Sequence, residues 1–317
     1  MDVVTPTGPK FRGSRCARHS VTRGWMLRRV VSVLAALAAT WSADAQIRVV
    51  DDTGATVALA APARRIVTLA PHAAELVYAA GAGAAIVGVV KGSDYPAAAR
   101  ALPVIGDVAT LDLERIVSLS PDLVVTWPWT TPTQVAWLRA RGIAVFEADA
   151  RTVEGIADDV ERIGALAGTQ AMAAPAAAAL RARIALLTRA STAVPALRVF
   201  YQISGVPLFT LGGNHLVSRA IAQCGGANVF AALTIPAPEI SVEAVLAADP
   251  QVIVAGTNGA AKPAWLSAWM QWPAIDAVRH RDLYAVDANL LHRPGPRFVD
   301  GVAQLCDVLE QARRSRR

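Results

Sequence analysis

Residues 113–125 read LERIVSLSPDLVV, and residues 242–254 read VEAVLAADPQVIV. In each stretch a glutamate, Glu114 or Glu243, stands in the first turn of a short helical pattern with an apolar face. A proline turn at Pro121 or Pro250 follows, and then a strand that reads as buried. The two copies lie 129 residues apart, which is too long a period for a solenoid. The repeat therefore predicts two similar lobes with a ligand cleft between them.

Short β-branched or leucine-rich runs alternate with helical patterns in both halves of the chain. We expect strands at residues 66–69, 86–90, 123–126, 145–146, 198–202, 208–210, 252–255 and 283–286. We expect helices at residues 73–80, 113–119, 133–141, 152–167, 170–190, 214–223 and 296–313. This order of elements is typical of α/β lobes with mostly parallel sheets, whose strands are buried on both faces.

The helical region between the two halves divides the chain. Its second part is rich in alanine, and apolar residues recur there at steps of three and four, so an ordered helix is favoured over a disordered linker. We expect an N-terminal extension and signal peptide at 1–45, an N-terminal α/β lobe at 46–150, a helical connector at 151–192 and a C-terminal α/β lobe at 193–317.

The N-terminal region has the features of an export signal. Arg28 and Arg29 precede an apolar run of 11 residues, Val30 to Thr40, which is too short to span a bilayer. The run is followed by Ala43-Asp44-Ala45, an A-x-A cleavage signal. We therefore expect a Sec signal peptide that is cleaved after Ala45.

The positive charge of the chain is concentrated at its ends. The formal net charge is +6, and residues 1–29 alone carry seven Lys and Arg against one acid. Residues 46–312 have a net charge of −3. A slightly acidic body lacks the basic surface that binds DNA or RNA, so no nucleic-acid partner is expected.

Export also bears on the cysteines. Cys16 lies ahead of the cleavage site, which leaves Cys224 and Cys306 in an oxidising compartment. An even number of cysteines there predicts one disulfide, with two buried helical thiols as the alternative.

The sequence lacks the common catalytic motifs. There is no HExxH, CxxC or GxSxG motif and no Walker loop, and the histidines after Ala45 show no spacing typical of metal ligands. We expect no catalytic residue, no metal site and no cofactor. An exported chain of two lobes without a catalytic constellation indicates a binding protein.

Several segments resemble periplasmic cobalamin-binding proteins, the substrate-binding subunits of ATP-driven cobalamin importers. They read RIVTLAPHAAELVYAAGAG, KGSDYP, LDLERIVSLSPDLVVTW, FYQISGVPLFTLGGNHLVSRAIAQCGGANVF and HRPGPRFVDGVAQLC. The resemblance runs from about Arg64 to Leu309. The SPDLVV segment is shared with the wider class that binds siderophores and haem, whereas SDYP with LxLER, CGGxNVF and RPGPR is more specific.

The resemblance implies a class III periplasmic binding protein, with two Rossmann-like lobes joined by a single long helix and a ligand cleft between them. The corrin would lie in this cleft against flat aromatic side chains. The matching positions are Pro71, His72, Tyr95, Trp127, Trp129 and Phe209. Core packing is the alternative for the two tryptophans, and Tyr201 and His215 are weaker candidates.

The chain departs from the family pattern at the cleft. Glu147 stands where some members carry a tryptophan, and Leu290 and Leu291 stand where some carry aromatic residues. The aromatic cage is therefore expected to be thinner in this chain than in those members.

The resemblance also implies partners. Glu114 and Glu243 match the two glutamates at the lobe tips that dock on arginines of the transporter, and their alternative role is to favour the dipole of their own helices. The cysteine pair of the family matches Cys224 and Cys306. We thus expect a periplasmic monomer whose partners are the membrane permease and ATPase subunits of an importer.

Three functions are carried forward. The favoured one is capture of cobalamin or a related corrinoid. A protein of the same class that binds haem or a siderophore is the alternative, with His72 and Tyr95 or Tyr201 as iron ligands. An exported enzyme that modifies tetrapyrroles is less favoured, because the chain lacks paired acids and metal-ligand spacing.

Overall fold

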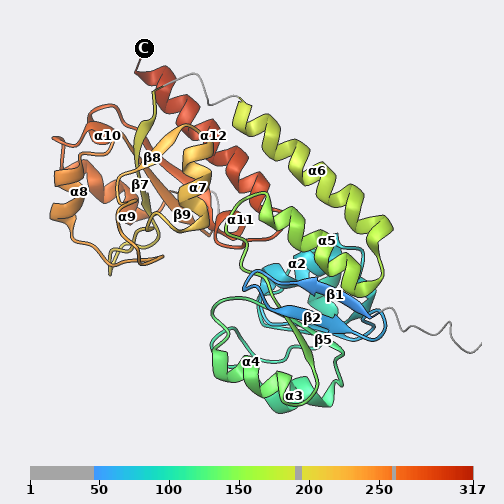
Figure 1. Cartoon of the computed structure of the whole chain (residues 1–317). Coiled ribbons are helices and arrows are strands. Elements are labelled where there is room, and N and C mark those ends of the chain that lie inside the picture. The colour runs from blue at the N-terminus through green and yellow to red at the C-terminus, as the bar shows by residue number, and fades with distance from the viewer. Residues whose placement is uncertain (1–45, 190–194, 259–261, 317) are drawn as a thin grey trace, which may run out of the picture. The chain divides into compact units, whose positions relative to one another are not determined.

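The computed structural model describes residues 46–189, 195–258 and 262–316, which form two lobes built on parallel sheets (Figure 1). The expected signal peptide, its cleavage site at Ala45 and Cys16 lie outside the described residues.

The first lobe is a four-stranded parallel sheet with helices on both faces. Its strands, in the order β4-β3-β5-β6, are β3 (Ile66–Thr68), β4 (Ile86–Val89), β5 (Leu123–Thr126) and β6 (Ala144–Glu147). One face packs on α2 (Pro71–Ala79) and α5 (Gly155–Ala167), and the other on α3 (Leu113–Ser118) and α4 (Pro132–Arg139). The 3₁₀ turns are η1 (Gly83–Ala85) and η2 (Ala97–Ala101). Alternate residues of β5 point to opposite faces, so Leu123 and Val125 enter one core and Val124 the other.

The second lobe repeats this arrangement. Its strands, in the order β10-β9-β7-β8, are β7 (Leu197–Gln202), β8 (Gly226–Asn228), β9 (Val252–Thr257) and β10 (Leu283–Asp287). One face packs on α7 (Leu216–Gln223) and α12 (Phe298–Ser315). The other face packs on α8 (Val242–Ala248), α9 (Ala264–Ser267), η3 (Ala268–Gln271) and α10 (Asp276–Arg279), and α11 (Ala288–Leu291) follows β10.

The internal repeat predicted from the sequence is confirmed. Taken in chain order, β3 to β6 and β7 to β10 occupy the same positions in their two sheets. The helices α3 and α8 both lead into a left-handed residue, Ser120 (φ 46°) or Asp249 (φ 38°), directly before the proline. The central strands β5 and β9 follow. The same local sequence therefore builds the same helix–turn–strand unit twice.

One helix connects the two lobes. The helices α5 and α6 (Gln170–Arg189) form a hairpin that turns at Gly168, whose φ of 69° suits a residue without a side chain. Helix α6 contacts α2 of the first lobe and α12 of the second (Figure 1). Within the described residues α6 also has, by length and composition alone, the features of a membrane-spanning helix. Here its Arg181 pairs with Asp158 and Glu161 of α5, and its Arg183 pairs with Asp300 of α12.

The apolar core is continuous between the lobes. The inner faces of both sheets and the helices α2, α5, α6, α7 and α12 form one buried cluster. The disulfide predicted from the cysteine count is present in this layer, where Cys224 at the end of α7 bonds Cys306 of α12. The lobes thus share a packed layer on the side away from their outer helices.

Several parts of the fold differ from the sequence prediction. The hairpin of β1 (Ile47–Val50) and β2 (Thr56–Leu59), the short strand β8, the turns η1 to η3 and the short helices α9 to α11 were not expected. The strand expected at 208–210 is wrong, because Phe209 forms only isolated bridges, with Ser204 and Glu239. Prolines at 207, 236 and 238 flank these bridges, and a proline has no backbone N–H to extend a ladder.

Charged side chains from both lobes meet in a cluster that we call the inter-lobe ion cluster, made of Glu75, Asp94, Arg293 and Arg297. Arg297 donates two hydrogen bonds to Glu75, from Nε to Oε2 at 2.9 Å and from Nη2 to Oε1 at 2.6 Å. Arg293 pairs with Asp94 at 2.6 Å and lies 4.0 Å from Glu75. Burial raises the pKa of Glu75, and the hydrogen bond and charge of Arg297 oppose that rise.

Two further residues shape this junction. The guanidinium of Arg297 lies 4.1 Å from the centre of the Tyr95 ring. A Cβ at Gly295 would lie 3.2 Å from His72 Cβ and 3.3 Å from Glu75 Oε2. The segment RPGPR therefore approaches α2 closely because its central residue has no side chain.

We expect Arg297→Met to destabilise the protein. The Glu75 side chain is only 2% exposed, and the loss of Arg297 leaves this buried carboxylate without its two hydrogen bonds. A buried charge without its partner is costly, and the remaining charge of Arg293, 4.0 Å from Glu75, reduces that cost here to about 2–4 kcal/mol. Urea unfolding measures the change.

Asp94→Asn is the matched control: the side chain is 50% exposed, so its loss should cost only about 0–1 kcal/mol. Equal stability of Arg297→Met and the unmodified chain would contradict a stabilising role of the cluster.

Candidate ligand-binding cleft

A cavity of about 450 Å³ lies between the lobes. The first lobe contributes Trp127, Pro128, Trp129, Ala148, Asp149, Ala150 and Arg151. The second lobe contributes Asn214, His215, Leu216, Pro236, Leu291, His292, Pro294 and Phe298. The first-lobe residues follow the carboxyl ends of β5 and β6, which is where open parallel sheets bind ligands.

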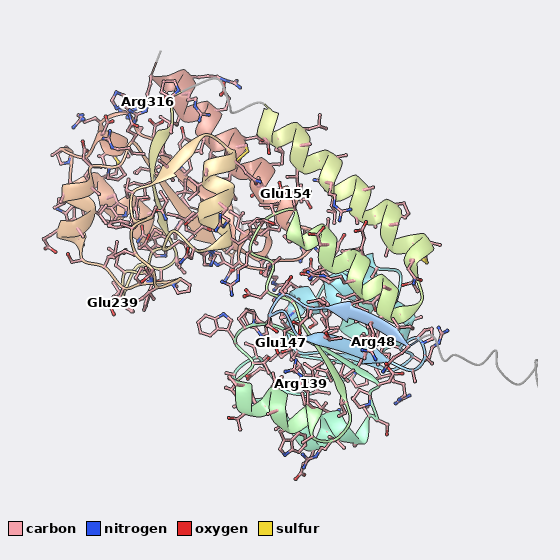
Figure 2. The ribbon with its side chains drawn as sticks, viewed as in Figure 1. Arg48, Arg139, Glu147, Glu154, Glu239 and Arg316 are labelled. Atoms are coloured by element: carbon pink, nitrogen blue, oxygen red, sulfur yellow. A yellow bond between two sulfur atoms is a disulfide. The ribbon has the colours of Figure 1, made fainter. Side chains whose placement is uncertain are left out.

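A second hollow adjoins this cavity on the first lobe. It measures about 640 Å³ and shares Pro128, Asp149 and Arg151 with the cleft. Its wall includes Arg139 of α4 and Glu147 of β6, which pair at 3.1 Å and are labelled in Figure 2. The space open to a ligand therefore continues from the cleft along the first lobe.

Trp127 and Trp129 form an aromatic wall on the first-lobe side of the cavity, and His72 packs against it. The two rings are tilted against each other, and their centres lie 6.1 Å apart. Trp129 is 70% exposed, so its ring is accessible to a ligand. His72 packs edge-on to Trp127 at 5.2 Å and is itself buried. Burial and the charge of Arg293 lower the pKa of His72 to about 3, so the ring is neutral at physiological pH.

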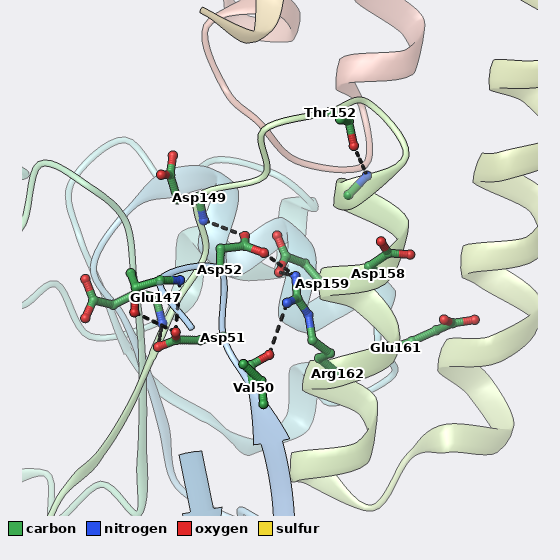
Figure 3. A network of polar contacts seen from close by, with 12 residues as sticks. Val50, Asp51, Asp52, Glu147, Asp149, Thr152, Asp158, Asp159, Glu161 and Arg162 are labelled. Atoms are coloured by element: carbon green, nitrogen blue, oxygen red, sulfur yellow. Dashed lines mark hydrogen bonds and ion pairs between the residues drawn. The ribbon is translucent and has the colours of Figure 1, made fainter. Parts of the chain in front are cut away.

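The N-terminal hairpin fixes the segment that follows β6. Asp52 accepts a hydrogen bond from the backbone N–H of Asp149 at 2.7 Å, and Asp51 accepts one from that of Glu147 at 3.3 Å (Figure 3). Asp51 and Asp52 lie in the turn between β1 and β2. The hairpin that sequence reasoning missed thus positions residues 148–151 in the cleft wall.

Helix α5 holds the hairpin in turn. Arg162 donates to the carbonyl oxygen of Val50 at 3.1 Å, to Asp52 and to Asp159, the last at 2.7 Å (Figure 3). Burial and the neighbouring charge of Asp52 raise the pKa of Asp159 well above its usual value. This network anchors the cleft wall to the helix that packs under the first sheet.

Two histidines lie in the second-lobe wall. His215 precedes α7, and its Nδ1 accepts the backbone N–H of Val217 at 3.1 Å. His292 follows α11, and its Nε2 lies 3.0 Å from the buried hydroxyl of Tyr201. Burial and the charge of His292 lower the pKa of His215 to about 4, and burial lowers that of His292. Across the described residues, no group of three or more His, Cys, Asp or Glu is placed to hold a metal ion.

The six ligand positions implied by the resemblance fall into two groups. Trp127 and Trp129 line the cavity. The others do not line it: Pro71 begins α2, His72 lies behind Trp127, Tyr95 packs on Arg297, and Phe209 lies in a loop of the second lobe. A ligand contact from these four residues stays a prediction.

The two glutamates assigned to docking lie outside the cavity. Glu114 and Glu243 are the second residues of α3 and α8, and both are exposed. Their helices are capped by Asp112 and Ser241, whose side chains accept backbone N–H groups. Each helix lies on the outer face of its sheet (Figure 1).

Sequence reasoning missed part of the cleft. Residues 148–151 could have been found from their position directly after a parallel strand. His292 and Phe298 flank the RPGPR segment. Phe298 begins the apolar face of α12, but no local pattern assigns either residue to the cleft.

Comparisons with known proteins agree with this architecture. Residues 66–290 match the family model described as periplasmic binding protein. The vitamin B12-binding protein of Vibrio cholerae is 36% identical over 255 residues, which covers 80% of this chain and 91% of that protein.

Solved structures of periplasmic binding proteins share this fold. The crystal structure of the periplasmic vitamin B12 binding protein BtuF of Vibrio cholerae superposes with a TM-score of 0.74 at 35% identity, covering 80% of this chain and 98% of that one. The periplasmic heme-binding protein RhuT of Roseiflexus sp. RS-1 gives a TM-score of 0.68 at 26% identity, covering 78% and 98%. With its two parallel-sheet lobes and a family match over most of its length, the chain belongs to the periplasmic binding protein family.

Proposed function

We propose that this chain captures cobalamin or a related corrinoid in the periplasm and delivers it to an ATP-driven importer of the inner membrane. In this proposal the signal peptide is removed after Ala45, and the mature protein acts as a monomer without catalysis. The observation that carries the proposal is the aromatic wall of Trp127 and Trp129 at the mouth of an inter-lobe cavity. Flat rings suit the broad apolar faces of a corrin.

The charges around the cleft favour a neutral ligand. Arg151 lines the cavity and pairs with Asp149. Arg293 and Arg297, which flank the lining residue Pro294 in sequence, pair with Asp94 and Glu75. An anionic ligand such as haem, with its two carboxylates, is best bound by arginines that have no carboxylate partner. A corrin carries neutral amides at its edge and needs no such cation.

The space available also supports a large ligand. The cleft and the adjoining hollow measure about 450 and 640 Å³ and share three wall residues. Each alone lies within the roughly 300–1,000 Å³ of a pocket for a drug-sized molecule. The two together accommodate a ligand that is larger than a typical drug.

A titration with two metallated tetrapyrroles tests the proposal. We expect cyanocobalamin to bind the purified protein at one site by calorimetry, and we expect hemin to bind more weakly. Hemin binding without cyanocobalamin binding would replace the proposed ligand by haem. Chemical turnover of either compound over time would point to an enzyme.

We expect Trp127→Ala to weaken cyanocobalamin binding by about 1–3 kcal/mol, because a large apolar contact surface is lost. Trp137→Ala on α4 is the matched control, since Trp137 packs with Arg141 outside the cavity. This substitution should leave the affinity unchanged.

His72→Ala should not change the absorption spectrum of the bound corrinoid, because His72 lies behind Trp127. A spectral shift would instead indicate coordination of cobalt by His72.

We expect Glu114→Arg and Glu243→Arg each to impair uptake strongly, and both together to abolish it. The two glutamates sit at equivalent exposed positions of two similar lobes, which suits a transporter built from two copies of one membrane subunit. An exposed ion pair contributes only about 0–1 kcal/mol, but loss of one partner at a desolvated interface costs roughly 2–5 kcal/mol.

Transport into vesicles with the cognate permease and ATPase measures this effect. Asp307→Arg on the exposed side of α12 is the matched control, with the same change of charge away from the lobe tips. Cobalamin affinity of the isolated variants should stay unchanged. Normal transport by the double variant would exclude the docking role, and reduced affinity would place the glutamates in the pocket or the fold.

A further inference from the structure

We propose that the second-lobe wall of the cleft binds the amide-bearing edge of the ligand through two imidazole N–H donors, Nε2–H of His215 and Nδ1–H of His292. This inference rests on the proposed corrinoid function and names the protein groups that read the edge of the corrin. It follows from the hydrogen bonds that fix one nitrogen of each ring and from the position of both rings in the cavity wall.

The tautomer of His215 is set by the start of α7. The backbone N–H of Val217 can only donate, so Nδ1 of His215 must accept and carries no proton. A neutral imidazole holds its single proton on the other nitrogen. Nε2 of His215 is therefore a donor.

The tautomer of His292 is set by Tyr201. The phenol of Tyr201 is fully buried, and burial raises its pKa far above the usual value, so the group keeps its proton. Among the described residues, the one hydrogen-bond partner of that hydroxyl is His292 Nε2 at 3.0 Å. The hydroxyl donates to Nε2, because its buried proton would otherwise have no acceptor. His292 consequently carries its own proton on Nδ1.

Both remaining nitrogens belong to residues that line the cleft. His215 and His292 line the cavity, and their second nitrogens have no hydrogen-bond partner among the described residues. Neither nitrogen is among the buried unpartnered atoms, in contrast to Nε2 of His72. Each nitrogen is therefore not fully buried, and its N–H has no partner among the described residues, so it is available to a ligand in the cleft.

Two neutral N–H donors favour the amide carbonyl groups at the edge of a corrin over carboxylates or a metal ion. Both histidines are neutral, since burial lowers both pKa values. A neutral N–H pairs well with an amide carbonyl and supplies no positive charge for a carboxylate. A proton on each ligand-facing nitrogen also leaves no lone pair there to coordinate a metal.

Isosteric variants separate the donors from their structural roles. In His215→Asn, the side-chain oxygen still accepts the N–H of Val217, because asparagine is a good N-cap, but the shorter amide places no N–H at the position of Nε2. In His292→Gln, the side-chain oxygen still accepts from Tyr201, and no N–H remains at the position of Nδ1. His280→Asn, at the residue that follows α10, is the matched control outside the cavity.

Cyanocobalamin and aquacobinamide are the probes, because both carry the amide edge and only the first carries a nucleotide. We expect each variant to bind both probes about 3- to 10-fold more weakly, with an unchanged melting temperature and no effect of His280→Asn. The visible bands of bound aquacobinamide should also match those of the free compound.

Three results would overturn the inference. Unchanged affinity of both variants would show that the histidines do not touch the ligand. Weakening confined to cyanocobalamin would place them at the nucleotide. Shifted bands of aquacobinamide that vanish in a histidine variant would mean that the imidazole coordinates cobalt. If the unmodified protein binds neither corrinoid, the proposed function itself fails, which is a different outcome.

Discussion

A parallel sheet must be covered on both faces, and this constraint organises the whole molecule. Each lobe has an outer layer of its own, α3 and α4 in the first and α8 to α10 in the second. The inner layers are not separate, because α2, α5, α6, α7 and α12 close into one apolar cluster. Opening the cleft widely would expose this shared core to water. The lobes are therefore coupled by the same burial that stabilises each of them.

The charged residues reinforce that coupling at the edge of the cleft. SDYP contributes Asp94 and Tyr95, and RPGPR contributes Arg293 and Arg297. Both segments are among those that carry the family resemblance, yet neither Asp94 nor Tyr95 lines the cavity. Their side chains meet across the lobe boundary, with Glu75 as the buried carboxylate. A motif characteristic of a binding family, such as SDYP, can thus hold the two lobes together without lining the cavity.

The sequence was informative where a local pattern has a single structural solution. The pattern of a helix, a proline turn and a buried strand predicted both ends of β5 correctly. It predicted the first residue of β9 correctly and placed its end two residues too early. The hairpin of β1 and β2 was missed, although two short β-rich runs on either side of a turn with Gly54 are a hairpin signal. β8 was missed because its three residues, Gly226–Asn228, carry no run of β-branched side chains. In the cleft, Trp127 was expected from the family resemblance, and it lines the cavity directly after β5. The contact of Glu75 with Arg297, 222 residues away, leaves no trace in either local pattern.

The chemistry of the cleft follows from how its charges are used. Arginines near the cavity are bound to carboxylates, and the histidines in and behind its wall are kept neutral by burial. What remains for a ligand is aromatic surface on one lobe and neutral hydrogen-bond donors on the other. Such a surface is selective because an anion would enter without a counter-charge and a small apolar molecule would leave the donors unpaired. A broad apolar ring system with carbonyl groups at its rim satisfies both walls at once.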